Sequence, residues 1–270
     1  MSGAAPVYVH GYDASEHQRL HDQAGALEAL LHAGTAYPPG SAVLEAGCGV
    51  GAQTVVLARN SPQARIVAVD VSPASIAEAR RRVEAAGCDN VRVLQADILD
   101  LPLAEASFDH VFVCFVLEHL SDPLCALGAL RRLLRPGGTI TVIEGDHGSA
   151  FFHPDHADAR AAIACLVELQ RRAGGDALIG RRLTRLLQQA GFAGARTAPR
   201  TVHADGGCPE LAEAFTRRTF AAMVAATRDA ALRAGLIAPA RFDAGVAALH
   251  RTAAADGALC YTFFKTVAVR

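Results

Sequence analysis

Short, nearly uninterrupted apolar runs alternate with segments of helical periodicity from residue 40 onward. Continuous apolar runs are typical of strands in a parallel sheet that helices cover on both faces. The alternation of strand and helix favours right-handed crossovers and a doubly wound α/β layer. Five strands are predicted in the first half of the chain, at Ala42–Gly47, Ala64–Asp70, Val91–Asp97, Phe108–Phe115 and Thr139–Gly145.

Local signals mark the ends of the helices between these strands. Ser72-Pro73 and Asp122-Pro123 each combine a capping side chain with a proline at the first helical position. Gly87 ends the first of these helices, and the run "RPGG" at 135–138 ends the second. We therefore expect helices that begin after Ser72 and after Asp122.

The rhythm changes after Glu144. Helical patterns occupy 157–190 and 209–234, a sixth strand lies within 190–203, and the alternating run Leu259–Val269 is predicted as the last strand. Helices inserted at about 150–190 and 209–250 would cover the carboxyl edge of the sheet, where ligands bind in such folds.

The N-terminal segment is predicted as a separate helical lid over residues 1–40. Apolar residues at Leu20, Ala24, Leu27 and Leu31 fall on one helical face. Residues 41–270 would then form the core that carries the sheet and its helical insertions.

Composition narrows the function classes. The chain has 270 residues and is 51% hydrophobic and 20% charged, a composition that excludes a disordered chain. Its formal net charge of −1 gives no sign of the basic surface that nucleic-acid binding requires. The seven cysteines include no C-x-x-C pair, which favours a reducing compartment over a disulfide framework. No signal peptide or membrane-length apolar run is visible, so we expect a cytoplasmic protein.

The glycine-rich stretch "VLEAGCGVGAQT", from Val43 to Thr54, links the first strand to the first helix. Glycine relieves the penalty of a positive φ and removes a Cβ that would block a ligand. Asp70 ends the second strand about 20 residues later, where a carboxylate accepts from two ribose hydroxyls. Both a nicotinamide dinucleotide and S-adenosylmethionine fit these two features.

Three further features separate those cofactors. Glu45 lies inside the first strand, where dinucleotide-binding strands carry an apolar residue. Asp97 ends the third strand, where a carboxylate can accept from an adenine amino group. The runs "SFDHVFVCFVLEHLSDP" and "LRRLLRPGGTITVIEG" then supply a fourth strand, a helix and a fifth strand.

With these motifs the sequence resembles the class I S-adenosylmethionine-dependent methyltransferases, closely over Val43 to Glu144 and loosely elsewhere. The resemblance implies a seven-stranded, mostly parallel sheet of order 3-2-1-4-5-7-6 with strand seven antiparallel. It implies that the glycine loop faces the methionine part of the cofactor, and that Cys114 and Phe115 lie beside the sulfonium. The implied cofactor-binding residues are Tyr12, Arg19, Gln23, Glu45, Gly47, Gly49, Asp70, Val71, Asp97, Ile98, Cys114 and Phe115.

Two other classes remain open. A nicotinamide-dependent oxidoreductase would have to explain Glu45 and Asp97, and the chain's only lysine, Lys265, stands in the last strand without a Tyr-x-x-x-Lys pair. A protein that binds S-adenosylmethionine without transferring its methyl group, such as a regulator or a cyclase, would keep the same glycine loop and carboxylates.

The candidate catalytic residues lie at the N-terminus and after the fifth strand. In similar methyltransferases an N-terminal tyrosine closes over the methionyl group and the acceptor, which makes Tyr8 and Tyr12 candidates. His147 is a candidate base, with Asp146 or Glu144 to orient it.

The acceptor is expected to be a small molecule, aromatic or heteroaromatic in one version of this hypothesis, methylated at N, C or O. "CFVLEH" replaces the Asn/Asp-Pro-Pro-aromatic motif of the base-amine methyltransferases, and the charge disfavours nucleic acid. The histidines and carboxylates after the fifth strand have no standard ligand spacing, so we expect no metal. We expect no membrane partner and allow for a homodimer.

Overall fold

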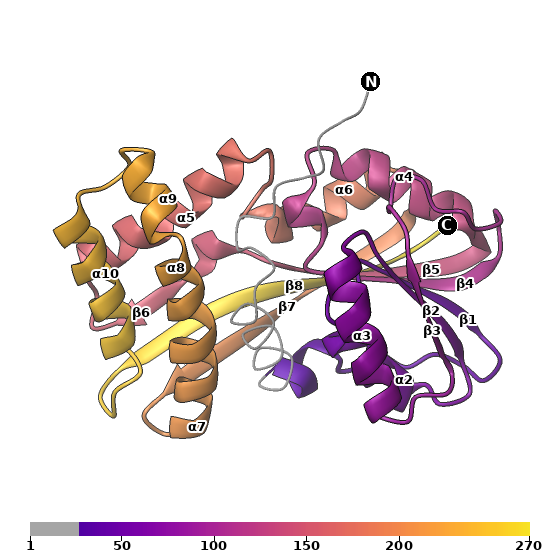
Figure 1. The fold of residues 1–270 in the computed structure, drawn as a ribbon, viewed down its shortest axis with the longest axis horizontal. Helices are drawn as coiled ribbons and strands as arrows, with labels where there is room; N and C mark the ends of the chain where they lie inside the picture. The colour runs from indigo at the N-terminus through magenta and orange to yellow at the C-terminus, as the bar shows by residue number, and fades with distance from the viewer. Residues whose placement is uncertain (1–26) are drawn as a thin grey trace.

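The computed structural model describes residues 27–270, in which one mixed sheet runs through two helical layers (Figure 1). Residues 27–31 are helical. The first half then contains β1 (Ala42–Ala46), α2 (Ala52–Asn60), β2 (Arg65–Asp70), α3 (Pro73–Ala85), β3 (Val91–Gln95), β4 (Phe108–Cys114), the 3₁₀ turn η1 (Leu117–His119), α4 (Pro123–Leu133) and β5 (Leu134–Gly145). The helix starts predicted after Ser72 and Asp122 are confirmed, since each of these side chains accepts a hydrogen bond from the first turn of its helix.

The second half adds the helices that flank the last strands. Its elements are η2 (His147–Ser149), β6 (Phe151–His153), α5 (Ala157–Arg172), η3 (Ile179–Arg182), α6 (Leu183–Gln189), β7 (Ala193–Asp205), α7 (Pro209–Leu211), the π-helix η4 (Ala212–Ala221), α8 (Ala222–Ala226), α9 (Arg228–Arg233), α10 (Pro239–Arg251) and β8 (Ala258–Val269). None of the described helices is both long and apolar enough to cross a bilayer.

The strand order is β3-β2-β1-β4-β5-β8-β6, and β7 pairs with the other edge of β8. The strands β1 to β5 are mutually parallel, whereas β8 is antiparallel to β5, β6 and β7. This confirms the predicted fold class, with β7 and β8 in the places of strands six and seven. The short strand β6 was not predicted. Its three residues pair with the same edge of β8 as β5 does, farther along that edge.

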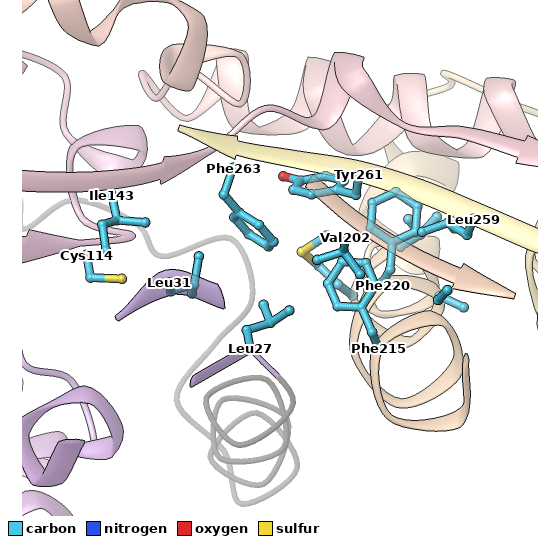
Figure 2. Close-up of a cluster of buried hydrophobic side chains, with 14 of the residues drawn as sticks. Leu27, Leu31, Cys114, Ile143, Val202, Phe215, Phe220, Leu259, Tyr261 and Phe263 are labelled. Carbon is cyan, nitrogen blue, oxygen red and sulfur yellow. The ribbon is translucent and has the colours of Figure 1, made fainter. Parts of the chain in front are cut away.

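A layer of buried hydrophobic side chains covers each face of the sheet. On one face, α4 and α6 pack on apolar side chains of β1, β4 and β5 that include Leu44, Val113 and Val142. On the other face, Leu27 and Leu31 of the N-terminal helix join Phe112, Ile143 and the aromatic residues of η4 and β8 (Figure 2). The second layer therefore brings residues 27–31 against the same face as the helices that precede β8.

Lys265, the only lysine of the chain, fastens the end of the N-terminal helix to β8. Its buried ammonium donates to the carbonyl oxygens of Leu31 at 3.1 Å and Ala33 at 2.9 Å, and to the Thr35 hydroxyl. These contacts span more than 200 residues of sequence, and they occupy the carbonyl groups that a helix leaves unpaired at its C-terminal end.

Candidate active site

The glycine loop after β1 is a tight turn whose three glycines have different surroundings. All three have a positive φ, 78° at Gly47, 52° at Gly49 and 77° at Gly51. A Cβ at Gly47 would lie 2.3 Å from a methyl group of Val116, and one at Gly51 would lie 3.0 Å from the Ala79 Cα in α3. A Cβ at Gly49 would meet nothing within 4 Å. The outer glycines are therefore required for packing, whereas Gly49 presents bare backbone to open space.

Asp70 at the end of β2 holds this loop in place. Its two carboxylate oxygens accept from the backbone N–H groups of Gly49, at 2.8 Å, and Ser72, at 2.9 Å. Ser72 itself caps α3, so Asp70 is not the helix cap. Burial raises the pKa of Asp70, although its backbone hydrogen bonds counteract that effect. The carboxylate lies beside the open face of Gly49.

Glu45 in β1 is a buried carboxyl group directly below the loop. It is 2% exposed and accepts from the Thr54 hydroxyl of α2 at 2.5 Å. Burial, with a smaller contribution from the negative charge of Asp70, raises its pKa to about 7. Its protonation state can thus change near neutral pH, and a cation bound above the loop would favour the ionised form.

The carboxyl ends of β2 and β3 carry the residues predicted around the nucleoside. Val71 is 44% exposed, Asp97 is exposed, and Ile98 is buried. Asp97 Oδ1 accepts from the Leu99 backbone N–H at 2.9 Å. These side chains share one edge of the sheet with Asp70, because β2 and β3 are parallel neighbours.

The end of β4 makes a strained turn. Phe115 has a φ of 58°, an uncommon value for a residue other than glycine, and such strain concentrates at functional sites. Its ring lies 5.4 Å from the ring of Phe263 in β8, and Cys114 is buried just before it. The two residues that were predicted beside the sulfonium therefore lie between the glycine loop and an aromatic cluster.

That aromatic cluster was missed by sequence reasoning. It contains Phe215 and Phe220 of η4 and Tyr261 and Phe263 of β8, with ring centroids 4.7 to 6.5 Å apart (Figure 2). The alternation of Tyr261 and Phe263 could have placed them on one face of the last strand. Phe215 and Phe220 are five residues apart, and only a π-helix brings residues at that spacing to nearly the same side.

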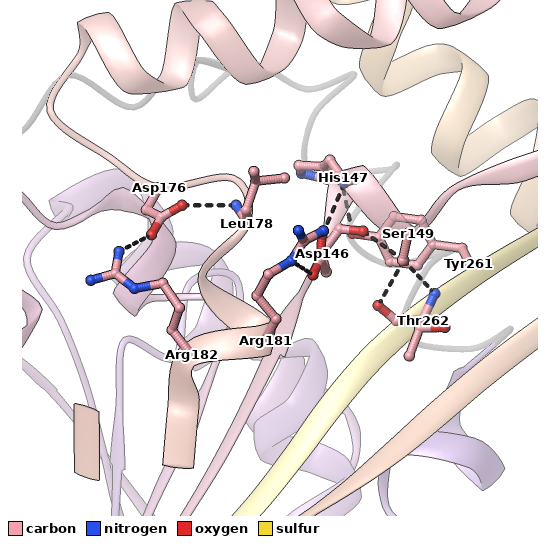
Figure 3. A network of polar contacts seen from close by, with 10 residues as sticks. Asp146, His147, Ser149, Asp176, Leu178, Arg181, Arg182, Tyr261 and Thr262 are labelled. Atoms are coloured by element: carbon pink, nitrogen blue, oxygen red, sulfur yellow. Dashed lines mark hydrogen bonds and ion pairs between the residues drawn. The ribbon is translucent and has the colours of Figure 1, made fainter. Parts of the chain in front are cut away.

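The polar groups after β5 take partners that differ from the prediction. Asp146 accepts from the Gly148 backbone and pairs with the Arg181 guanidinium through both of its oxygens (Figure 3). Glu144 accepts from the backbone N–H groups of residues 116 and 117. Among the described residues, neither carboxylate forms a hydrogen bond or an ion pair with the His147 ring, so the expectation that one of them orients it is not met.

His147 is oriented instead by residues from two other elements. The Tyr261 hydroxyl lies 3.0 Å from His147 Nδ1, and Glu118 Oε2 lies 3.7 Å from His147 Nε2. Gln170 of α5 donates to both the carboxylate and the backbone oxygen of Glu118. The remaining predicted residues, Tyr8, Tyr12, Arg19 and Gln23, lie outside the described residues. Within residues 27–270 no three His, Cys, Asp or Glu side chains gather as a metal site.

Known proteins share this domain and this fold. A family model described as a methyltransferase domain matches residues 43–138. A demethylmenaquinone methyltransferase of Thermus thermophilus is 39% identical over 102 residues, 38% of this chain and 46% of that protein. An uncharacterized 37.1 kDa protein of a Streptomyces fradiae transposon is 37% identical over 164 residues, 60% of this chain and 46% of that protein. The chain thus spans less than half the length of these curated relatives.

A solved structure extends the likeness to nearly the whole fold. Phosphoethanolamine N-methyltransferase 2 of Haemonchus contortus, solved with phosphomonomethylethanolamine and S-adenosylhomocysteine, superposes with a TM-score of 0.59 at 16% identity. The superposition covers 98% of this chain and 61% of that one. With the glycine loop and the sheet order, these findings show that residues 43–138 form a methyltransferase domain and that the chain has the Rossmann-like fold of the class I S-adenosylmethionine-dependent methyltransferases.

Proposed function

We propose that this chain transfers the methyl group of S-adenosylmethionine to a small molecule. The observation that carries the proposal is the open backbone at Gly49 with the Asp70 carboxylate beside it. A nucleoside cofactor needs close approach to the loop and a carboxylate for its ribose hydroxyls, and this corner of the sheet offers both. The residues present therefore fit S-adenosylmethionine.

Within this proposal the cofactor contacts follow the edge of the sheet. Gly47 and Gly49 with Glu45 face the methionine part, Asp70 and Val71 the ribose, and Asp97 with Ile98 the adenine. Cys114 and Phe115 lie next to the sulfonium, while Tyr12, Arg19 and Gln23 of the lid complete the site. The carboxylates of Glu45, Asp70 and Asp97 also suit a ligand that carries a sulfonium and an ammonium group.

The chemistry asks little of the protein beyond placement. When bound, the cofactor supplies a methyl group that is already electrophilic. The chain's residues hold the nucleophile in line and exclude water, and orientation of this kind is worth about 7–11 kcal/mol in well-aligned systems. The buried rings of Phe215, Phe220 and Phe263, with the partly buried ring of Phe115, support an acceptor with an apolar body. His147 is the candidate base of this site.

We also propose the class of acceptor, the cellular compartment and the oligomeric state. Two of the similar proteins carry the names demethylmenaquinone methyltransferase and phosphoethanolamine N-methyltransferase, and this supports a small-molecule acceptor over nucleic acid. All seven cysteines are free thiols, which supports a reducing, cytoplasmic compartment. We include a homodimer in the proposal, and analytical ultracentrifugation of the purified chain measures its oligomeric state.

Calorimetric titration with S-adenosylmethionine, with NADH as the comparison ligand, tests the cofactor directly. We expect micromolar binding of the first and none of the second, and loss of binding in Asp70→Asn but not in the exposed control Asp100→Asn. Binding of NADH alone would overturn the proposal. Release of S-adenosylhomocysteine only when an acceptor is present then separates a methyltransferase from a protein that binds the cofactor without using it.

A further inference from the structure

Three buried side chains from three elements form a line at the carboxyl edge of the sheet. Tyr261 of β8 is 2% exposed, His147 of η2 is 6% exposed, and Glu118 of η1 is 7% exposed. The Tyr261 hydroxyl lies 3.0 Å from His147 Nδ1, and His147 Nε2 lies 3.7 Å from Glu118 Oε2. Tyr261 is 114 positions from His147, so only the folded chain joins them.

The charge on Glu118 sets the direction of the hydrogen bonds. Burial alone would raise the pKa of this carboxyl, but the His119 and His147 imidazoles and the Gln170 amide outweigh it, so the pKa is lowered. An ionised Glu118 favours a proton on His147 Nε2, which leaves Nδ1 as a lone pair. Tyr261 then donates its hydroxyl proton to Nδ1, and its oxygen keeps lone pairs for another donor.

The ring of Tyr261 belongs to the aromatic cluster that reaches toward the proposed cofactor site. Its ring centroid is 4.7 Å from that of Phe263, which in turn lies 5.4 Å from that of Phe115 after β4. Two buried acceptors near the same edge, Glu144 Oε2 and Gln170 Oε1, have no hydrogen-bond partner among the described residues. A bound molecule that carries a hydrogen-bond donor would satisfy such groups.

We propose that Tyr261, His147 and Glu118 form a proton relay for the methyl acceptor, and that this acceptor is a neutral hydroxyl or amine on an apolar ring. This rests on the methyltransferase function proposed above. The lone pair of the nucleophile forms the bond to the methyl carbon, and the carbon–sulfur bond breaks with its electron pair left on sulfur. The acceptor's proton passes to the Tyr261 oxygen while the tyrosine proton passes to His147 Nδ1, where Glu118 stabilises the imidazolium.

Other charged groups also face the relay. His119 lies 3.7 Å from the second oxygen of Glu118, and Glu144 of β5 interacts with Glu118 through its charge. Asp146 is neutralised by Arg181 of η3. Any pH profile must therefore be compared between variants in which only one relay member changes.

The first test needs neither cofactor nor acceptor. Nitrogen NMR of the full chain labelled at histidine, with the His147 signal assigned through His147→Gln, reports which ring nitrogen carries the proton. We expect the Nε2–H form, and a shifted Nδ1 signal in Tyr261→Phe because Nδ1 then loses its hydrogen-bond donor. A proton on Nδ1, or an Nδ1 signal unchanged in Tyr261→Phe, would overturn the relay.

The second test uses tritium-labelled S-adenosylmethionine with a panel of phenols and anilines, and with aromatic carboxylates and tertiary amines as comparison acceptors. We expect label on the phenols or anilines, and a kcat lowered about 100-fold or more in Tyr261→Phe without a change in cofactor affinity, since general acid–base catalysis contributes at least this much. Tyr37→Phe is the matched control, because Tyr37 is a half-buried tyrosine with a buried hydroxyl, and its ring stacks on that of His110 away from the relay.

The outcomes separate this inference from the function on which it rests. Failure to bind S-adenosylmethionine would count against the methyltransferase itself. Binding followed by label only on carboxylates or tertiary amines, or an equal kcat in Tyr261→Phe and Tyr37→Phe, would overturn the relay and leave the methyltransferase standing.

Discussion

Replacing Gly49 with alanine separates the role of the glycine loop in folding from its role in binding. The alanine would have a φ of 52°, and a side chain in this left-handed region costs about 1–2 kcal/mol. Its Cβ meets no protein atom within 4 Å, so no packing penalty adds to that cost. For a chain of this size we expect the melting temperature to fall by roughly 2–4 °C per kcal/mol.

Cofactor affinity should fall much further than this stability loss suggests. The new methyl group enters the space that we assign to the cofactor, on backbone that Asp70 holds by a 2.8 Å hydrogen bond. An extra methyl group in a packed contact costs about 1–3 kcal/mol, which corresponds to a loss of affinity of about 5- to 150-fold. Calorimetry with S-adenosylmethionine measures this change.

Two other glycines supply the controls. Gly87→Ala changes a residue with a φ of 62° and open space around it, so it should cost the same stability and leave affinity unchanged. Gly51→Ala adds a contact of 3.0 Å with the α3 backbone and should destabilise by about 2–5 kcal/mol. If Gly49→Ala and Gly87→Ala bind the cofactor equally well, Gly49 does not face it and the reasoning fails.

Three further perturbations probe neighbouring groups. Asp70→Ala should weaken cofactor binding by at least about a hundredfold, because two ribose hydroxyls lose a charged acceptor; an unchanged Kd would remove Asp70 from the site. Glu45 has a pKa of about 7 in the fold, above its ordinary value of 4.5. Between these two pH values the native state therefore holds a proton that the unfolded state has lost. The free energy of unfolding of the cofactor-free protein should therefore fall as pH rises from 4.5 to about 7, and Glu45→Gln should flatten that slope in denaturant titrations; parallel slopes would contradict this. Lys265→Met leaves the carbonyls of Leu31 and Ala33 without their donor. We therefore expect the free energy of unfolding to fall by about 1–3 kcal/mol and amide hydrogen exchange over residues 27–35 to become faster. Unchanged exchange there would show that Lys265 does not anchor the helix.

Local patterns were enough to predict the sheet and the edge where the candidate site lies. The apolar runs of β1 to β5 and the caps at Ser72 and Asp122 act within a few residues, so periodicity and capping chemistry reveal them. The carboxylates Asp70 and Asp97 were predicted at strand ends for the same reason. β6 escaped because three residues show no periodicity, and they form a strand only by pairing with β8.

The partners of His147 could not be predicted from the chain. Asp146 is its neighbour in sequence and was therefore predicted as its partner, but the Asp146 carboxylate forms an ion pair with Arg181 instead. Tyr261 reaches the imidazole because β8 runs antiparallel beside β5 and carries the hydroxyl to the end of that strand. Contacts of this kind depend on the register between distant strands, which no local pattern records.

The position of β8 also limits the order in which the chain can fold during synthesis. β5, β6 and β7 all pair with this strand, which forms from residues 258–269. Until those residues leave the ribosome, the thirteen-residue β7 has no partner, and unpaired strand edges are templates for aggregation. The N-terminal helix likewise gains the bonds from Lys265 only after β8 is made. A nascent chain that stalls before residue 258 can form the parallel strands β1 to β5, but it lacks β8 and the aromatic side chains that β8 supplies. We therefore expect such a chain to need protection by chaperones.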